Sequence, residues 1–296
     1  MKKLFSLFTA IVMLFALAAC TGSAQNGSSD VSSASSLASS AASSPTQSSS
    51  RSPSSVPPFV YTPPLIESAR DYFETLTYTD SATGTPIDYM FHEPVRKSDA
   101  KRPLVIYMHH LGDDLNEGNL GITATMVASL MKYESNSDEY SAYALFPITP
   151  TKAEGWWDYD QLEAFKKLFY HLTETYNIDT KRVYIVGLSM GGFTICQLLD
   201  EMPANTFAAA VPMSACSNLL DPKAHANTAF HIFHSTNDNT VNVACARSLN
   251  QQLLQSGHTK TTYTEFKNGD HSSPMRDVFS LQRDTFMPWL FAQRLP

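Results

Sequence analysis

One serine lies in a spacing typical of an enzymatic nucleophile. Ser189 is the central residue of the pentapeptide GLSMG at 187–191, a G-x-S-x-G pattern. The apolar stretch 182–186 before it predicts a strand, and the stretch that opens at Met190 predicts a helix. A sharp turn between strand and helix holds such a serine hydroxyl out above the sheet edge, while the two glycines leave room for strand and helix to approach. This context favours a nucleophile elbow over an ordinary glycine-rich turn.

A serine hydroxyl is a poor nucleophile without a base, so a histidine is needed. In strand-helix folds with this elbow the base follows the nucleophile and the acid in chain order. His271 lies in the turn sequence NGDH after the last expected strand and is the predicted base. His231 and His234 lie within an expected strand, where structural roles are favoured. His225 and His258 lie in polar stretches and are expected to be exposed to solvent.

The predicted acid is Asp238, at the carboxyl end of the strand expected over 230–234. Its carboxylate would fix the tautomer of His271 and stabilise the imidazolium that forms during the reaction. Asp221, which follows the preceding strand, is the second choice. Asp270 is the third, since adjacent side chains rarely pair well with each other.

An oxyanion hole requires two backbone N–H groups near the nucleophile. Met190, the residue after the serine, is expected to supply one of them. Leu111, in the loop after the strand expected over 104–109, is expected to supply the other.

A metal site is the competing interpretation of the same loop. His109, His110, Asp113 and Asp114 are all residues that can bind a metal ion. No third histidine follows at a regular spacing, and a complete serine triad needs no metal. We therefore predict no metal and no cofactor.

Strands and helices alternate along the chain from residue 73 onward. Strands are predicted at 73–80, 87–92, 104–109, 143–146, 183–186, 207–213, 230–234 and 261–266. Helices are predicted at 121–132, 159–176, 190–202, 241–255 and 273–294. This alternation predicts an α/β fold with a mostly parallel sheet covered by helices, and antiparallel strands at its N-terminal edge.

Composition excludes several other classes of protein. The 296 residues are 43% hydrophobic and 17% charged, which allows a sizeable core. A net charge of −7 disfavours a nucleic-acid partner, which would need a basic surface. No glycine-rich phosphate loop is present, which disfavours a nucleotide enzyme.

The first twenty residues have the features of an export signal. Lys2 and Lys3 precede an apolar run over 4–19, which is short for a membrane span. The run ends in LAAC at 17–20, which resembles the lipobox of bacterial lipoproteins. That resemblance implies cleavage before Cys20 and acylation of its sulfur. We expect an exported protein whose partner is the membrane, held on its outer face by the lipid on Cys20.

The predicted domain organisation has three parts. Residues 1–20 form the signal peptide. Residues 21–62 are rich in serine and proline and cannot bury enough apolar surface to fold, so they are expected to be a tether. Residues 63–296 form the catalytic domain, with no internal repeat and no second domain.

Three cysteines remain once Cys20 is assigned to the lipid, namely Cys196, Cys216 and Cys245. One disulfide with one buried thiol would suit an exported protein. Three buried free thiols are the plainer expectation.

Several segments together resemble a known family. KRPLVIYMHHLGDD, YNIDTKRVYIVGLSMGGF, FAAAVPMSACS, HIFHSTNDNTVNV and YTEFKNGDHSS look like α/β-hydrolases of the phospholipase/carboxylesterase group. They are similar to secreted bacterial "predicted peptidase" esterases, polyhydroxybutyrate depolymerases and feruloyl esterases. The resemblance covers about residues 70 to 296 and implies ester hydrolysis through an acyl-enzyme. It assigns the same five roles to the nucleophile, acid, base and oxyanion donors named above.

The resemblance also indicates residues near the substrate. The family usually has glycine where this sequence has His110, so this side chain is expected either to narrow the site or to accompany a shifted backbone. Family members often carry a tryptophan where this chain has Trp156 and Trp157. We predict that Trp156 or Trp157 lines the substrate pocket, where the ring could stack on a sugar or an aromatic acyl group. The alternative for either ring is that it packs beneath the loop as core.

The leading hypothesis is a serine hydrolase of carboxylic esters, acting on a small-molecule, glycan-linked or polymer-linked ester. A serine peptidase that uses the same triad is the alternative within this class. A non-catalytic lipoprotein that kept the fold and binds at the cell surface is the alternative outside it.

Overall fold

The computed structural model describes residues 71–96, 98–111, 121–149, 156 and 159–296. Within them one sheet of eight strands runs through the domain. Its strands are β1 (Glu74–Thr79), β2 (Pro86–His92), β3 (Arg102–Met108), β4 (Tyr143–Ile148), β5 (Ile178–Leu188), β6 (Ala209–Met213), β7 (Ala229–Ser235) and β8 (Thr261–Phe266).

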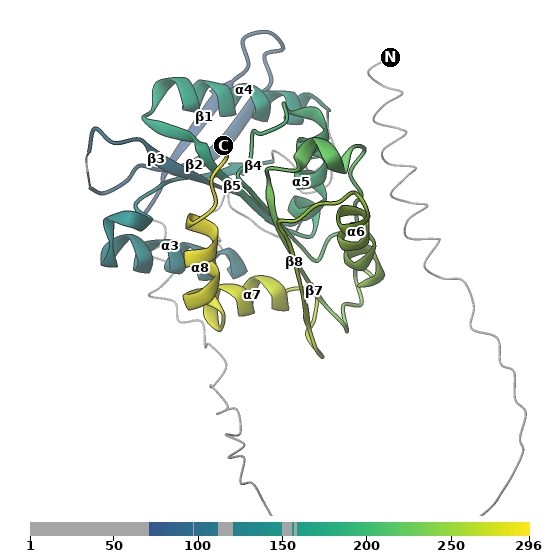
Figure 1. Cartoon of the computed structure of the whole chain (residues 1–296). Coiled ribbons are helices and arrows are strands. Elements are labelled where there is room, and N and C mark those ends of the chain that lie inside the picture. The colour runs from purple at the N-terminus through teal and green to yellow at the C-terminus, as the bar shows by residue number, and fades with distance from the viewer. Residues whose placement is uncertain (1–70, 97, 112–120, 150–155, 157–158) are drawn as a thin grey trace, which may run out of the picture.

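The strands lie in the order β1-β2-β4-β3-β5-β6-β7-β8 (Figure 1). β1 pairs antiparallel with β2, and β2 pairs antiparallel with β4. All later neighbours are parallel. The carboxyl ends of β3 and β5 to β8 therefore share one edge of the sheet, which is where side chains that follow different strands can meet.

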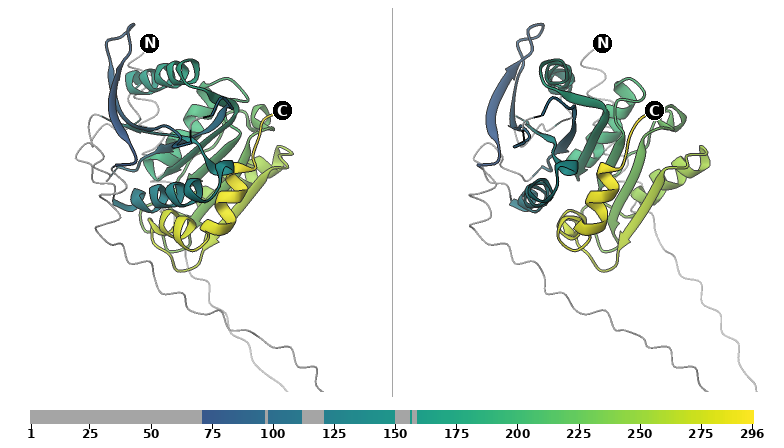
Figure 2. Two further views of the ribbon diagram at one scale, coloured as in Figure 1. Left: turned by 90° about the vertical axis from the view of Figure 1, so that its left-hand side faces the viewer. Right: turned by 60° about the vertical axis from the view of Figure 1, so that its left-hand side comes forward.

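Helices cover both faces of the sheet (Figure 2). They are α3 (Ala124–Asn136), α4 (Tyr159–Thr175), α5 (Met190–Glu201), α6 (Ala244–Gln255), α7 (Ser273–Ser280) and α8 (Arg283–Phe291). Residues of α4, α5 and α6 share one buried cluster with one face of the sheet. Residues of α3, α7 and α8 share a second cluster with the other face.

The central strands supply side chains to both clusters in alternation. In β3, Leu104, Ile106 and Met108 belong to the first cluster, whereas Val105 and Tyr107 belong to the second. Successive side chains of a strand point to opposite faces, so a strand covered on both sides must be apolar throughout. This explains the unbroken apolar run LVIYM at 104–108.

Two elements differ most from the sequence-based expectation. β5 begins at Ile178 rather than near Val183, because Arg102 of β3 pairs with Ile178 across an irregularity in the ladder. The C-terminal helix expected over 273–294 is two helices, α7 and α8. The amides of Leu281 and Gln282 both donate to the carbonyl oxygen of Asp277, which ends α7.

A buried polar cluster lies where the described chain begins. Glu134 of α3 accepts hydrogen bonds from the Tyr72 hydroxyl and from His92 Nε2, each at 2.9 Å. It also accepts from the amide of Val95 at 3.0 Å and the hydroxyl of Ser141 at 3.2 Å. Burial acts to raise the pKa of Glu134, but the hydrogen bonds outweigh it and hold the pKa below its usual range. The carboxylate is therefore charged and satisfied inside the domain.

A disulfide joins the loop after β6 to the first turn of α6. It links Cys216 to Cys245, and Cys196 is a buried free thiol whose pKa burial raises to about 12. The expectation of three free thiols is therefore wrong: chain folding brings together two cysteines that are 29 residues apart in the sequence.

No helix in the described ranges is both long and apolar enough to cross a bilayer.

Candidate active site

Ser189 occupies a strained turn between β5 and α5. Its backbone has φ 53° and ψ −117°, a positive-φ conformation that residues other than glycine rarely adopt. The Ser189 amide donates to the carbonyl oxygen of Met213 at 2.9 Å, which ties the turn to the carboxyl end of β6. Such strain persists where the surrounding structure imposes it, and it is characteristic of functional positions.

The two glycines of the pentapeptide are required by close packing. A Cβ on Gly191 would overlap the carbonyl oxygen of Met108 in β3. A Cβ on Gly187 would lie 2.6 Å from the carbonyl carbon of Gly191. The predicted close approach of strand and helix is therefore confirmed.

Asp238 and His271 are hydrogen-bonded to each other. Asp238 Oδ2 lies 2.7 Å from His271 Nδ1, and the two side chains are 0% and 19% exposed. Asp238 follows β7, whereas His271 follows β8, and these two strands are parallel neighbours. The sheet therefore brings together two side chains that are 33 residues apart in the sequence.

The carboxylate of Asp238 has further donors. Asp238 Oδ1 accepts from the amides of Thr240 and Val241, each at 2.9 Å. His234 Nε2 lies 3.3 Å from Oδ2. Burial acts to raise the pKa of Asp238, but hydrogen bonds from His234, His271 and the two amides hold the pKa far below its usual range. Asp238 is thus an anion at neutral pH, fixed on several sides.

The carboxylates of the other two candidate acids contact groups other than the His271 ring. Asp221 caps the short 3₁₀ helix Pro222–His225 by accepting from the amide of Lys223 at 3.1 Å. Asp270 accepts from the amide of Ser272 at 3.0 Å and from the hydroxyl of Ser273 at 2.9 Å. The carboxylate that reaches His271 is that of Asp238.

The loop that carries His271 is attached beside the serine turn. The hydroxyl of Ser214 donates to the carbonyl oxygen of His271 at 2.8 Å. Ser214 directly follows Met213, which accepts the amide of Ser189. Among the described side chains, Ser189 Oγ is not hydrogen-bonded to the His271 ring. In many enzymes this bond tightens only once substrate is bound.

The expected oxyanion donors lie on two elements next to this turn. Met190 is the first residue of α5, and the first amides of a helix have no partner within it. Leu111 follows β3, whose last residue Met108 pairs with Gly187 at the start of the pentapeptide. The Leu111 side chain is 44% exposed. Their role as donors stays a prediction.

The two histidines after β3 are held within the fold. His109 Nε2 accepts from the amide of Thr149 at 3.1 Å, and its Nδ1 lies 2.8 Å from the carbonyl oxygen of His110. His109 is thus neutral, with its proton on Nδ1, and joins the ends of β3 and β4. His110 is partly buried, and Asp113 and Asp114 lie outside the described residues. Both nitrogens of His109 are engaged, so this histidine is not available as a metal ligand.

Trp156 is a core residue in this structure. Its side chain is 0% exposed and lies in the same buried cluster as Phe165, with the ring centroids 6.2 Å apart. Its ring also lies 5.5 Å from that of His109. A fully buried ring offers no surface for stacking, so Trp156 takes the alternative role of a core residue, and the prediction that Trp156 or Trp157 lines the pocket then depends on Trp157. Trp157 lies outside the described residues.

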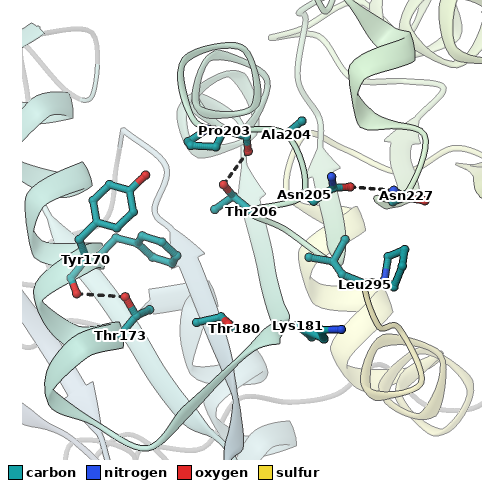
Figure 3. Close-up of a pocket in the computed structure, with 12 residues that line it drawn as sticks. Tyr170, Thr173, Thr180, Lys181, Pro203, Ala204, Asn205, Thr206, Asn227 and Leu295 are labelled. Atoms are coloured by element: carbon teal, nitrogen blue, oxygen red, sulfur yellow. Dashed lines mark hydrogen bonds between the residues drawn. The ribbon is translucent and has the colours of Figure 1, made fainter.

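A separate pocket of about 550 Å³ lies near the start of β5 (Figure 3). Among its lining side chains, Asn227 donates to Asn205 at 2.8 Å, and Thr206 donates to the carbonyl oxygen of Pro203 at 2.6 Å. Ser189 lies at the opposite end of β5. The pocket contains none of the predicted catalytic residues.

The strand order, the helices on both faces and the turn at Ser189 define the α/β-hydrolase fold, and by fold this chain is an α/β-hydrolase. Residues 151–226 match the prolyl oligopeptidase family. The chain is also 25% identical over 174 residues to a bifunctional acetylxylan esterase/xylanase of Neocallimastix patriciarum. This match covers 56% of the chain and 24% of that protein, so the chain spans about a quarter of the relative's length.

Two solved structures that match this chain are esterases. A thermostable esterase has a TM-score of 0.65 at 28% identity, over 76% of this chain and 64% of that one. A ferulic acid esterase from Anaeromyces mucronatus has a TM-score of 0.56 at 16% identity, over 73% of this chain and 91% of that one, and shares the fold. The chain is therefore an α/β-hydrolase similar to esterases and peptidases.

Proposed function

We propose that this protein is a serine hydrolase that cleaves carboxylic esters through an acyl-enzyme on Ser189. The observation that carries the proposal is the 2.7 Å hydrogen bond between Asp238 and His271, at the sheet edge where the strained turn presents Ser189. A buried carboxylate paired with a partly exposed histidine, beside a serine in an elbow, supports nucleophilic catalysis.

The residues would act in the following order. His271 takes the proton of the Ser189 hydroxyl through Nε2 as Ser189 Oγ attacks the ester carbonyl carbon. The carboxylate of Asp238 stabilises the resulting imidazolium. The amides of Met190 and Leu111 donate to the oxyanion.

Collapse of the tetrahedral adduct then releases the alcohol. His271 gives its proton to the leaving oxygen, and the acyl group stays on Ser189. A water molecule activated by His271 attacks the acyl-enzyme in the same way and releases the carboxylic acid.

The proposed substrates are short acyl esters and acetyl or feruloyl esters of glycans. Support comes from the likeness to an acetylxylan esterase/xylanase and to a thermostable esterase. His110, which follows β3 at this edge, and Trp157 are the side chains expected to contact the acyl or alcohol group.

We further propose that the protein works outside the cytoplasm. The leader that ends at Cys20 supports export and lipid attachment. The disulfide between Cys216 and Cys245 supports the same location, because disulfides persist in oxidising compartments.

Labelling of the full-length protein with a fluorophosphonate tests the nucleophile. Wild type is expected to be labelled and to hydrolyse p-nitrophenyl acetate, while Ser189→Ala is unlabelled and loses on the order of 10⁶-fold in kcat. A folded wild type that resists labelling would contradict the proposal and favour the non-catalytic surface-binding alternative.

A serine peptidase is the second candidate, because residues 151–226 match the prolyl oligopeptidase family. Rates on p-nitrophenyl esters, acetylated xylan, methyl ferulate and peptide p-nitroanilides separate the two candidates. Higher kcat/KM on the peptide amides than on every ester would favour the peptidase.

A further inference from the structure

His234 lies against the side of Asp238 that faces the interior. It is the second-last residue of β7, and its side chain is 0% exposed. Its Nε2 lies 2.9 Å from the carbonyl oxygen of Val241 and 3.3 Å from Asp238 Oδ2. Asp238 Oδ2 is also the atom that bonds His271, so two imidazoles share one carboxylate oxygen.

The partners of His234 define its tautomer. The carbonyl oxygen of Val241 can only accept a hydrogen bond, so the proton of His234 must be on Nε2. His234 Nδ1 is buried and has no hydrogen-bond partner among the described residues. A charged ring would leave the proton on Nδ1 buried and unsatisfied, which is costly. His234 is therefore neutral; it donates its Nε2–H to Val241 and keeps Nε2 3.3 Å from Asp238 Oδ2.

We propose that His234 is a positioning residue that holds Asp238 and limits the negative charge that Asp238 offers to His271. This inference rests on the proposed function. The two amides fix Oδ1 and His234 fixes Oδ2, so the carboxylate cannot rotate away from His271. The N–H side of His234 also lies against Oδ2, which lowers the negative charge that Asp238 presents to His271.

Glu265, with its partners Arg247 and Tyr263, is the other ionisable group among the described residues that faces His234, and its charge is already compensated. Glu265 of β8 lies opposite His234 in the register of the two strands. The carboxylate of Glu265 is already bonded to Arg247 at 2.6 and 2.8 Å and to the Tyr263 hydroxyl at 2.6 Å. Its charge is thus largely balanced.

Three variants of the full-length protein separate positioning from packing. His234→Phe keeps a buried ring and removes the donor, whereas His234→Gln keeps an N–H near the place of Nε2. His231→Phe is the matched control, because His231 lies three residues before His234 in the same strand and its Nε2 contacts Thr264 rather than Asp238. Each variant is compared with wild type by the pH dependence of kcat/KM and by the NMR resonance of the His271 Nδ1 proton.

His234→Phe is expected to move the acidic limb of the pH profile upward by about one pH unit, equal to tenfold on that limb. The Nδ1 proton of His271 should move downfield, because Asp238 Oδ2 then serves one donor only. His234→Gln and His231→Phe should retain the wild-type profile and resonance.

Unchanged profile and resonance in a folded His234→Phe would overturn the inference. Should that variant not fold, NMR of the wild-type ring nitrogens decides: a proton on His234 Nδ1 instead of Nε2 would overturn it equally. The NMR readouts do not require turnover. A protein without esterase activity that still shows the resonance shift would refute the proposed function and support the role of His234 in the pair.

Discussion

The hydroxyl of Ser214 is hydrogen-bonded to the backbone carbonyl oxygen of His271 at 2.8 Å. This contact fixes the loop after β8 to the end of β6, next to the residue that accepts the amide of Ser189. A buried serine that is not itself a predicted catalytic residue thus helps to fix the position of the predicted base relative to the predicted nucleophile.

Ser214→Ala is expected to lower kcat/KM about tenfold, because loss of one hydrogen bond of ~1.4 kcal/mol loosens the His271 loop. Ser129→Ala is the matched control, since Ser129 also donates from a buried hydroxyl to a carbonyl oxygen, that of Phe279 at 2.8 Å. Steady-state kinetics on a p-nitrophenyl ester measures both variants. Equal losses in the two would show that the Ser214 contact has no special bearing on the site.

Asp238→Asn is expected to lower kcat by roughly 10³–10⁴-fold, because an amide can hold His271 in the wrong tautomer. Asp221→Asn should leave kcat unchanged, since Asp221 caps a 3₁₀ helix and asparagine caps equally well. Burst and steady-state kinetics with circular dichroism would check both. A large loss of kcat in the folded Asp221 variant would reopen the choice of acid.

Stability is expected to fall as the solution becomes acidic. Hydrogen bonds from Arg247 and Tyr263 lower the pKa of Glu265 to about 2, and the pKa of Asp238 and of Glu134 is also lowered. A carboxylate with a lowered pKa in the folded state stabilises the protein at neutral pH, and this contribution is lost as pH falls below the unfolded-state value toward the folded-state value. For Glu265 that window runs from the ordinary value of 4.5 to about 2.

Urea unfolding across that window measures the effect. Asp238→Asn should show a shallower decline with falling pH than wild type, because one of the responsible carboxylates is gone. Parallel curves for the two proteins would contradict the assignment.

Removal of the disulfide should destabilise the domain. With Cys216 and Cys245 separated by 29 residues, the double variant to serine is expected to lose roughly 3–4 kcal/mol of unfolding free energy. Dithiothreitol should lower the stability of wild type and leave the double variant unaffected. Sensitivity of the double variant to the reductant would mean that another group is responsible.

Trp156→Ala is expected to lower the free energy of unfolding by about 3–5 kcal/mol, since the ring is fully buried. Trp156→Phe should recover part of this stability and leave KM for a p-nitrophenyl ester as in wild type. A raised KM in the stable Phe variant would instead indicate a contact with substrate.

Local patterns predicted much of this architecture. The pentapeptide around Ser189 carries its own strand-turn-helix context, and the buried strands are continuous apolar runs. The mostly parallel sheet and its antiparallel edge followed from the alternation of strands and helices, and the resemblance to known hydrolases implied the α/β-hydrolase fold.

Contacts that depend on distant partners were not predictable in the same way. His225 and His258 were expected to be exposed because their neighbours are polar, yet they are 4% and 6% exposed. His258 bonds the carbonyl oxygen of His225 at 3.1 Å and the Thr261 hydroxyl at 2.7 Å, partners that no sequence pattern reveals. For the same reason, the sequence left open whether two of the cysteines pair and whether Trp156 packs as core.

The contact of His234 with Asp238 could have been predicted from the spacing of the two residues. His234 and Asp238 are four residues apart across the end of a strand, which places both near one sheet edge. We expected a structural role for His234 but did not predict its contact with the carboxylate of Asp238.

The polar cluster around Glu134 determines how mechanical force would enter the domain. Tyr72 is held by Glu134 and stacks on His92, with ring centroids 3.5 Å apart. Tension along the preceding chain would therefore be borne by α3 and by β2 near one edge of the sheet. Strands β7 and β8, which position Asp238 and His271, lie toward the opposite edge of the sheet, away from this attachment.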